Sequence, residues 1–155
     1  MNAHPEYKYD VAISFLQEDE DLARKLNGLL LESLNTFVYF ERQKVLAGTN
    51  GEDTFNRVFG SETRIVVILF RDNWGTTPFT RIEETALRNR GYEEGYEFVI
   101  MIPLNEEPCM PRWLPKTSIW VGLERWGLES AAAWHVSLNS LTRDWPLCSL
   151  RRMIK

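Results

Sequence analysis

The chain has 155 residues, of which 44% are hydrophobic, and a formal net charge of -4 at pH 7. This profile is typical of one globular domain with a hydrophobic core, and it excludes a disordered chain, a collagen repeat and, with only two cysteines, a disulfide scaffold. The acidic balance argues against nucleic acid as a direct partner, and no apolar run approaches the roughly 20 residues of a membrane-spanning helix. We therefore expect a cytoplasmic protein without membrane association.

Short apolar runs alternate with helical patterns along the chain, which predicts parallel strands joined by helices. The first half predicts a strand over 9–15, a helix over 19–34, a strand over 36–40, a loop over 41–52 and a short helix from about Phe55 to Phe59. The second half predicts a strand over 64–70, a helix from Pro78 to about Arg90, strands over 98–104 and 118–121, and a closing helix over 128–141.

The run RIVVILF over 64–70 is continuously apolar, as expected of a strand buried on both faces, so we place it near the centre of the sheet. The predicted fold is α/β, with a flavodoxin-like sheet of five parallel strands and helices on both faces. No repeat or linker interrupts the chain before about residue 142, so one domain is expected over 1–142. Residues 143–155 are expected to form a C-terminal tail or a junction to a further domain.

In an open parallel sheet, ligands bind beyond the carboxyl ends of the strands. The loops at those ends span 15–19, 41–51, 71–78 and 105–111. The second of them contains Gly48 and Gly51, whose backbone freedom predicts a mobile loop. Cys109 and Cys148 have no metal-ligand spacing, so no metal site is expected.

The helix that starts at Pro78 carries two adjacent glutamates that are not equivalent. At about 100° per residue, with Phe79 placed at 0°, the apolar arc is centred close to 0°. Glu83 falls at about 40°, inside that arc, whereas Glu84 at about 140° points away from it. A carboxylate among apolar side chains loses hydration, which raises its pKa and suits it to accept a proton or to pair with a cationic ligand.

Two plainer interpretations of Glu83 stay open at this point: an ion pair with Arg64 or Arg71, or a boundary residue that reaches water. Its position favours a site, because this first helical turn follows a loop at a strand end. In that loop, Trp74 could offer a flat face to a planar ring, or it could cover the core. A flat aromatic face and a half-buried carboxylate together suit a planar cation such as oxidised, ribosylated nicotinamide.

At these residues the sequence resembles a Toll/interleukin-1 receptor (TIR) domain, most closely the bacterial members, over about residues 8–135. The opening YDVAISF over 9–15 is similar to the first box of the family. Before its catalytic helix the family has an aromatic, Ser three residues on, Trp two further, Cys next and Glu three after that. Those places are held here by Trp74, Thr77, Phe79, Thr80 and Glu83.

Three features depart from the family pattern. Phe79 replaces the usual Trp but keeps an aromatic core anchor, and Thr80 replaces the usual Cys. Ala47 precedes Gly48 where a Pro-Gly pair is typical, and the third family box is not evident.

The resemblance implies cleavage of NAD+ between nicotinamide and ribose, giving ADP-ribose or a cyclised isomer, with NAD+ as substrate, no cofactor and no metal. It implies that Glu83 is the catalytic residue. It also implies self-association through TIR-TIR contacts, in which the mobile loop of one domain completes the pocket of the next. A sensor domain or partner protein, and a role in bacterial anti-phage defence, are implied as well.

Substrate-binding residues are expected at the strand ends and in the mobile loop. The candidates are Ser14, Phe15, Lys44, Gly48, Trp74 and Thr77. Ser14 and Phe15 could instead cap or pack, and Lys44, which would meet the diphosphate, could simply be solvated.

The same sequence features are compatible with other functions. A non-catalytic TIR adaptor stays open, although the retained Glu83 favours an enzyme, and so does a nucleoside glycosidase of related fold. A phospho-receiver would use Asp72, just past the third strand, as acceptor. It is disfavoured because the fourth strand ends at Pro103 without the expected hydroxyl, and the fifth leads to Gly122 without a lysine.

Overall fold

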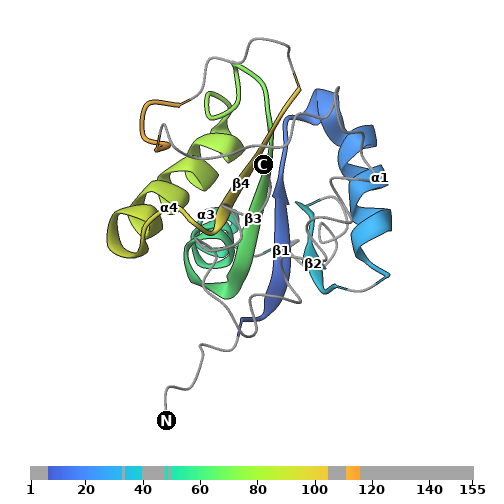
Figure 1. The fold of residues 1–155 in the computed structure, drawn as a ribbon, viewed down its shortest axis with the longest axis horizontal. Helices are drawn as coiled ribbons and strands as arrows, with labels where there is room; N and C mark the ends of the chain where they lie inside the picture. The colour runs from blue at the N-terminus through green and yellow to red at the C-terminus, as the bar shows by residue number, and fades with distance from the viewer. Residues whose placement is uncertain (1–6, 33, 40–47, 49, 105–110, 116–155) are drawn as a thin grey trace, which may run out of the picture.

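The computed structural model describes residues 7–32, 34–39, 48, 50–104 and 111–115. Within them, four parallel strands form one sheet in the order β2-β1-β3-β4 (Figure 1). The strands are β1 (Tyr9–Ser14), β2 (Thr36–Phe37), β3 (Thr63–Phe70) and β4 (Val99–Pro103). The helical elements are the 3-10 turn η1 (Gln17–Asp19), α1 (Glu20–Leu30), α3 (Gly51–Arg57), the π-helical turn η2 (Val58–Glu62) and α4 (Pro78–Glu94).

The predicted α/β class and the parallel sheet are confirmed, but the described sheet has four strands where five were expected. The expected strand over 118–121 and the closing helix over 128–141 lie outside the described residues, as does the proposed tail over 143–155. The 64–70 run lies inside the sheet as predicted, since β3 pairs with β1 on one side and with β4 on the other.

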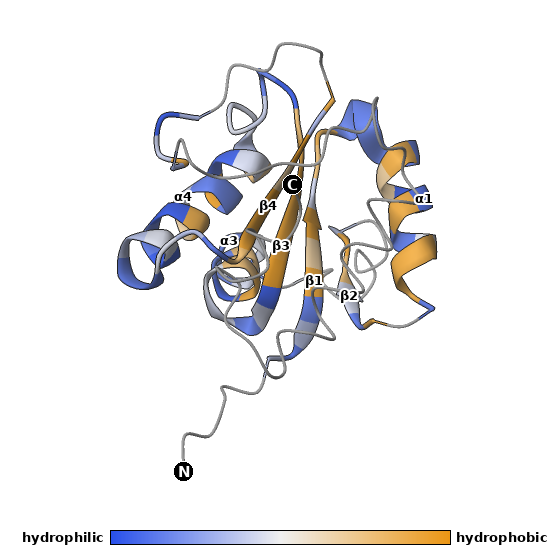
Figure 2. Cartoon of the chain, in the orientation of Figure 1, coloured by the Kyte–Doolittle hydropathy of each residue, from blue (hydrophilic) through white to orange (hydrophobic). Residues whose placement is uncertain are grey.

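Helices cover both faces of this sheet (Figure 1). One face packs against α1, and the other against α3, η2 and α4. Side chains alternate between the two cores along each strand, so Val66 and Ile68 face α4 while Ile65 and Val67 face α1. Figure 2 shows strongly hydrophobic strands and a mostly polar α4. The polar composition of α4 becomes important at the site.

The second strand and the first helix end earlier than predicted. The second strand is confined to Thr36–Phe37, because only these two residues pair with β1, at Val11 and Ala12. The first helix ends at Leu30 rather than near residue 34. The side-chain amide of Asn35 donates to the Lys8 carbonyl at 2.7 Å, and its backbone N–H donates to Asp10 at 2.9 Å. After one more turn, closed by the Leu34 N–H donating to the Leu30 carbonyl at 2.9 Å, these bonds tie the chain back to the start of β1.

Helix α4 starts where predicted and runs one turn further. Pro78 occupies its first turn and Thr77 caps it, with Thr77 Oγ1 accepting from the Thr80 backbone N–H at 3.3 Å. The helix continues to Glu94 and stops at Gly95, whose φ of 84° lies in the left-handed region that favours glycine.

Candidate functional site

The candidate site lies where the carboxyl end of β1 meets the buried face of α4. Ser14 is the last residue of β1 and is fully buried. It lies two residues after Ala12, which packs in the core on the α4 side, so the alternation of a strand turns Ser14 toward the same side. There the Ser14 hydroxyl donates a hydrogen bond to Oε2 of Glu83, 69 residues further along the chain.

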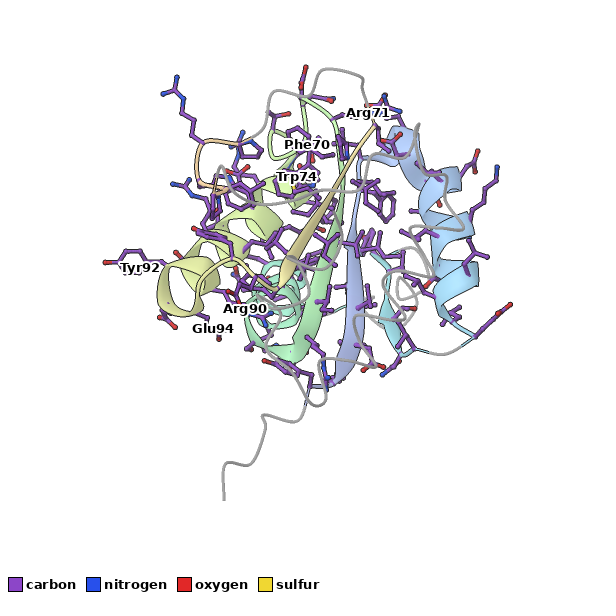
Figure 3. The ribbon with its side chains drawn as sticks, viewed as in Figure 1. Phe70, Arg71, Trp74, Arg90, Tyr92 and Glu94 are labelled. Carbon is purple, nitrogen blue, oxygen red and sulfur yellow. The ribbon has the colours of Figure 1, made fainter. Side chains whose placement is uncertain are left out.

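Trp74 joins this pair from the loop that follows β3. Its indole Nε1–H donates to the Ser14 Oγ at 2.8 Å. The indole ring packs against the rings of Phe70 and Trp113, with centroids 6.2 and 6.4 Å away, and only 4% of the residue is exposed. Figure 3 shows Trp74 below Phe70 and Arg71, at the end of β3. Three segments of the chain therefore meet at one hydroxyl group.

Burial dominates the electrostatics of Glu83. The residue is 6% exposed, and this desolvation raises the pKa of its carboxyl from 4.5 to about 8, while the hydrogen bond from Ser14 acts in the opposite direction. No charged group contributes to the shift. Glu83 is thus a buried acid that accepts a hydrogen bond from one neutral donor, the Ser14 hydroxyl, and whose pKa is raised toward physiological pH.

Neither plainer interpretation of Glu83 is supported by the described residues. No ion pair links Glu83 to an arginine among them, and Arg71 instead binds Asp19 through two guanidinium nitrogens, the shortest distance being 2.8 Å. The side chain does not reach water as a boundary residue would. It is also more deeply buried than the half-buried carboxylate that the sequence suggested.

The helical-wheel prediction was right about Glu83 and wrong about the centre of the buried face. The buried residues of α4 are Thr80, Glu83, Ala86, Leu87, Arg90 and Gly91. On the same wheel their mean direction is about 60°, so Glu83 lies close to the middle of the face. Phe79 is 50% exposed and contacts the rings of Tyr39 and Phe55, so it is an edge residue rather than the expected core anchor.

The other predicted binding residues do not all join this cluster. Phe15 packs against the core on the α1 side of the sheet, away from Glu83. Thr77 is occupied as the cap of α4, and its hydroxyl lies 2.6 Å from that of Thr80. Gly48 is an exposed turn residue with a φ of 84°, and Lys44 lies outside the described residues.

Trp74 lies in the site but not in the form expected. A stacking platform needs an open ring face, whereas this ring is buried between Phe70 and Trp113. Its contact with the site is through the indole N–H, which holds Ser14. The interpretation that Trp74 covers the core is the one that the geometry supports.

The burial of two charged residues, Asp19 and Arg90, was not predicted from the sequence. Asp19 is 4% exposed and, through Arg71, joins the start of α1 to the end of β3. Its hydrogen bond raises the pKa of the Arg71 guanidinium. Arg90 donates to the Thr63 carbonyl at 2.6 Å and lies 3.9 Å from the Phe98 ring centroid. Only the helical spacing of Arg90 with Glu83 and Leu87 hinted at its burial.

Two surface depressions lie apart from this cluster. A groove of about 550 Å³ runs between α3 and α4 and is lined by residues such as Asn56, Arg81 and Asn89. A second, of about 500 Å³, is lined by α3 and its cap Asn50. Neither of these two depressions is lined by Ser14, Trp74 or Glu83.

The described residues hold no group of three or more His, Cys, Asp or Glu side chains that could bind a metal ion. No helix among them is both long enough and apolar enough to cross a membrane.

No family model matches the sequence, and no curated protein matches it. Among solved structures, the chain is similar to the TIR domain of a Toll-related receptor from the lower metazoan Hydra magnipapillata. The TM-score is 0.50 at 16% sequence identity, over 73% of this chain and 83% of that one. This likeness shows that the chain has an α/β fold of the TIR type.

Proposed function

We propose that this chain is a TIR domain of bacterial type that cleaves NAD+ between nicotinamide and ribose, with Glu83 as the catalytic carboxylate. The supporting observation is that Glu83 on α4 is buried and has no charged partner among the described residues. It lies against the carboxyl end of β1, and ligands bind at this edge in parallel sheets. Buried acids without a charged partner destabilise a protein, so a chemical role gives a reason for this one.

The proposed chemistry uses the ionised form of Glu83. Departure of neutral nicotinamide leaves oxocarbenium character on the ribose carbon, and a carboxylate in a dry site stabilises that positive charge more strongly than one in water. Water then attacks the ribose carbon and loses one proton to the solvent, which gives ADP-ribose. Alternatively, a nitrogen of the adenine ring attacks the same carbon and the adenine loses one proton to the solvent, which gives a cyclised product. No metal or cofactor takes part in either route.

The proposal predicts a rate that rises with pH. Because the pKa of Glu83 is about 8 in the free protein, kcat/KM should climb through that value and level off above it. The cationic nicotinamide ring of bound NAD+ favours the ionised carboxyl and so lowers the pKa of Glu83 in the complex. The rise of kcat with pH should therefore occur at a lower pH than the rise of kcat/KM. Initial rates of nicotinamide release between pH 5.5 and 9.5 would check both rises.

A matched pair of variants tests the role of Glu83. Glu83→Gln keeps the shape and removes the charge, and we expect nicotinamide release to fall by roughly 100-fold or more. Glu84→Gln removes the neighbouring carboxylate, which lies 3.9 Å from Arg88 on the partly exposed side of α4, and should leave the rate unchanged. Equal activity in wild type and Glu83→Gln would remove the mechanism.

Assembly is part of the proposal. We expect self-association through TIR-TIR contacts to activate cleavage, and a sensor domain or partner protein to trigger it, in a cytoplasmic anti-phage response. The closed environment of Glu83 supports this, because an isolated domain with a covered carboxyl needs a rearrangement before NAD+ can bind.

A non-catalytic adaptor is the second candidate function. The observations that favour it are that neither of the two surface depressions described above is lined by Glu83, and that the structural neighbour is a receptor domain. An adaptor would associate without consuming NAD+. Assembled protein that leaves NAD+ intact over the pH range in which Glu83 is ionised would establish this alternative.

A further inference from the structure

We propose that Ser14 and Trp74 form a positioning relay for Glu83, in which the indole N–H fixes the Ser14 hydroxyl and that hydroxyl fixes the carboxyl group. This inference deepens the proposed function and rests on it for its catalytic meaning. Neither residue is assigned to the chemistry itself.

The direction of the relay follows from the donors and acceptors involved. The indole nitrogen of tryptophan can only donate, so Ser14 Oγ must be the acceptor in the 2.8 Å contact with Trp74. When Glu83 is ionised its Oε2 can only accept, so the single hydroxyl proton of Ser14 is directed to it. A hydroxyl that is free to rotate would not be committed to the carboxyl in this way.

Packing fixes both ends of the relay. Ser14 has no exposed surface and is held by the pairing of β1 with β3, where it lies opposite Ile68. The Trp74 ring is confined by Phe70 and Trp113, and its backbone N–H donates to the Arg71 carbonyl at 2.9 Å. The carboxyl group is therefore oriented by Ser14, which Trp74 holds in turn, before any substrate arrives.

The relay also favours the ionised form of Glu83. A donated hydrogen bond stabilises a carboxylate more than it stabilises a neutral acid, and it offsets part of the desolvation in a site that offers no positive charge. The charged residues on surrounding elements are Asp10 on β1, Arg64 on β3, Glu62 on η2, and Glu52, Asp53 and Arg57 on α3. None of them contributes to the shift, and Arg71 in the adjacent loop is bound to Asp19.

The test compares Ser14→Ala and Trp74→Phe with the wild type by direct titration of the Glu83 carboxyl. Protein labelled with ¹³C at the glutamate carboxyl is titrated by NMR, and the Glu83 signal is assigned by its absence in Glu83→Gln. We expect Ser14→Ala to raise the pKa of Glu83 by about one pH unit or more, since a hydrogen bond to a charged group contributes roughly that difference. Trp74→Phe keeps an aromatic ring and should shift the pKa in the same direction by a smaller amount.

Trp113→Phe is the matched control. Trp113 packs on the same aromatic cluster, but its buried Nε1 has no hydrogen-bond partner in the described part of the chain. Replacing it changes the packing and removes no hydrogen bond to the site, so the titration of Glu83 should stay within error of the wild type. A shift in Trp113→Phe equal to that in Trp74→Phe would mean that packing, and not the relay, sets the pKa.

The pH-rate profile gives the catalytic readout. At pH 7 Ser14→Ala should release nicotinamide about tenfold more slowly than the wild type, with much of the rate regained above the new pKa. A merely structural defect would lower the rate at every pH. Identical titration of Glu83 in wild type, Ser14→Ala and Trp74→Phe would overturn the relay whether or not the protein cleaves NAD+. The expected titration shifts in a protein without NAD+ cleavage would instead support the relay and reject the proposed function.

Discussion

A buried carboxyl group makes the stability of a protein depend on pH. Glu83 has a pKa of about 8 in the folded chain against 4.5 when exposed, so between these values the folded state retains a proton that the unfolded state releases. The contribution of Glu83 to the free energy of unfolding is therefore largest below about pH 4.5, and it decreases as the pH rises toward 8. This is opposite to the usual behaviour of a carboxylate in an ion pair.

Glu83→Gln should remove that loss of stability. We expect the variant to gain stability over the wild type as the pH rises from 5 to 9, by up to about 4 kcal/mol at the top of the range. Urea unfolding at several pH values measures the difference. The control Glu84→Gln should change little with pH, because its carboxyl is partly exposed. A stability difference between Glu83→Gln and the wild type that is flat with pH would show that Glu83 is not a buried acid.

Sequence patterns predicted the burial of Glu83 and the nearby position of Ser14, but not the hydrogen bonds that join Glu83, Ser14 and Trp74. The helical period alone placed this carboxyl on an apolar face. Ser14 was a candidate because the carboxyl ends of parallel strands lie at one edge of the sheet, where ligands bind. The bond from Trp74 to Ser14 was not predictable, because it depends on how the 71–77 loop folds back over β1. The same loop buries the ring that was expected to face a ligand.

At the scale of elements, α4 shows why a wheel built from apolar residues is incomplete. Its buried face includes Thr80, Glu83 and Arg90, whose polar atoms bond to groups on the loop before α4, on β1 and on β3. The partners of Glu83 and Arg90 are distant in sequence, and none of these partners carries a periodic signal. Pro78, by contrast, predicted the start of α4 correctly, because the cause is local.

Two glycines on different helices give opposite expectations for alanine. Gly95 ends α4 at a φ of 84°, so Gly95→Ala should destabilise the fold by about 1 kcal/mol. Gly28 lies on the exposed side of α1, where an added Cβ meets nothing within 4 Å, so Gly28→Ala should stabilise by roughly 0.5–1 kcal/mol. Thermal unfolding of both variants checks the pair. A stabilising Gly95→Ala would contradict the described end of α4.

At the scale of the whole molecule, alternating strands and helices predicted the parallel sheet and the inner position of β3. The order β2-β1-β3-β4 places the ends of β1 and β3 side by side, and through their loops it gathers Ser14, Trp74 and Glu83. Sequence patterns located this edge. The sequence patterns did not show that Ser14, Trp74 and Glu83 would be buried there, because this burial depends on side-chain packing between β1, the 71–77 loop and α4.

The rate of nicotinamide release per molecule, measured at rising protein concentration, is the most direct test of the central claim that Glu83 is a catalytic carboxyl uncovered by assembly. The wild type should release nicotinamide faster per molecule as the concentration increases, and Glu83→Gln should stay roughly 100-fold or more slower than the wild type at every concentration. Wild-type protein that self-associates yet releases no more nicotinamide than Glu83→Gln would contradict the claim.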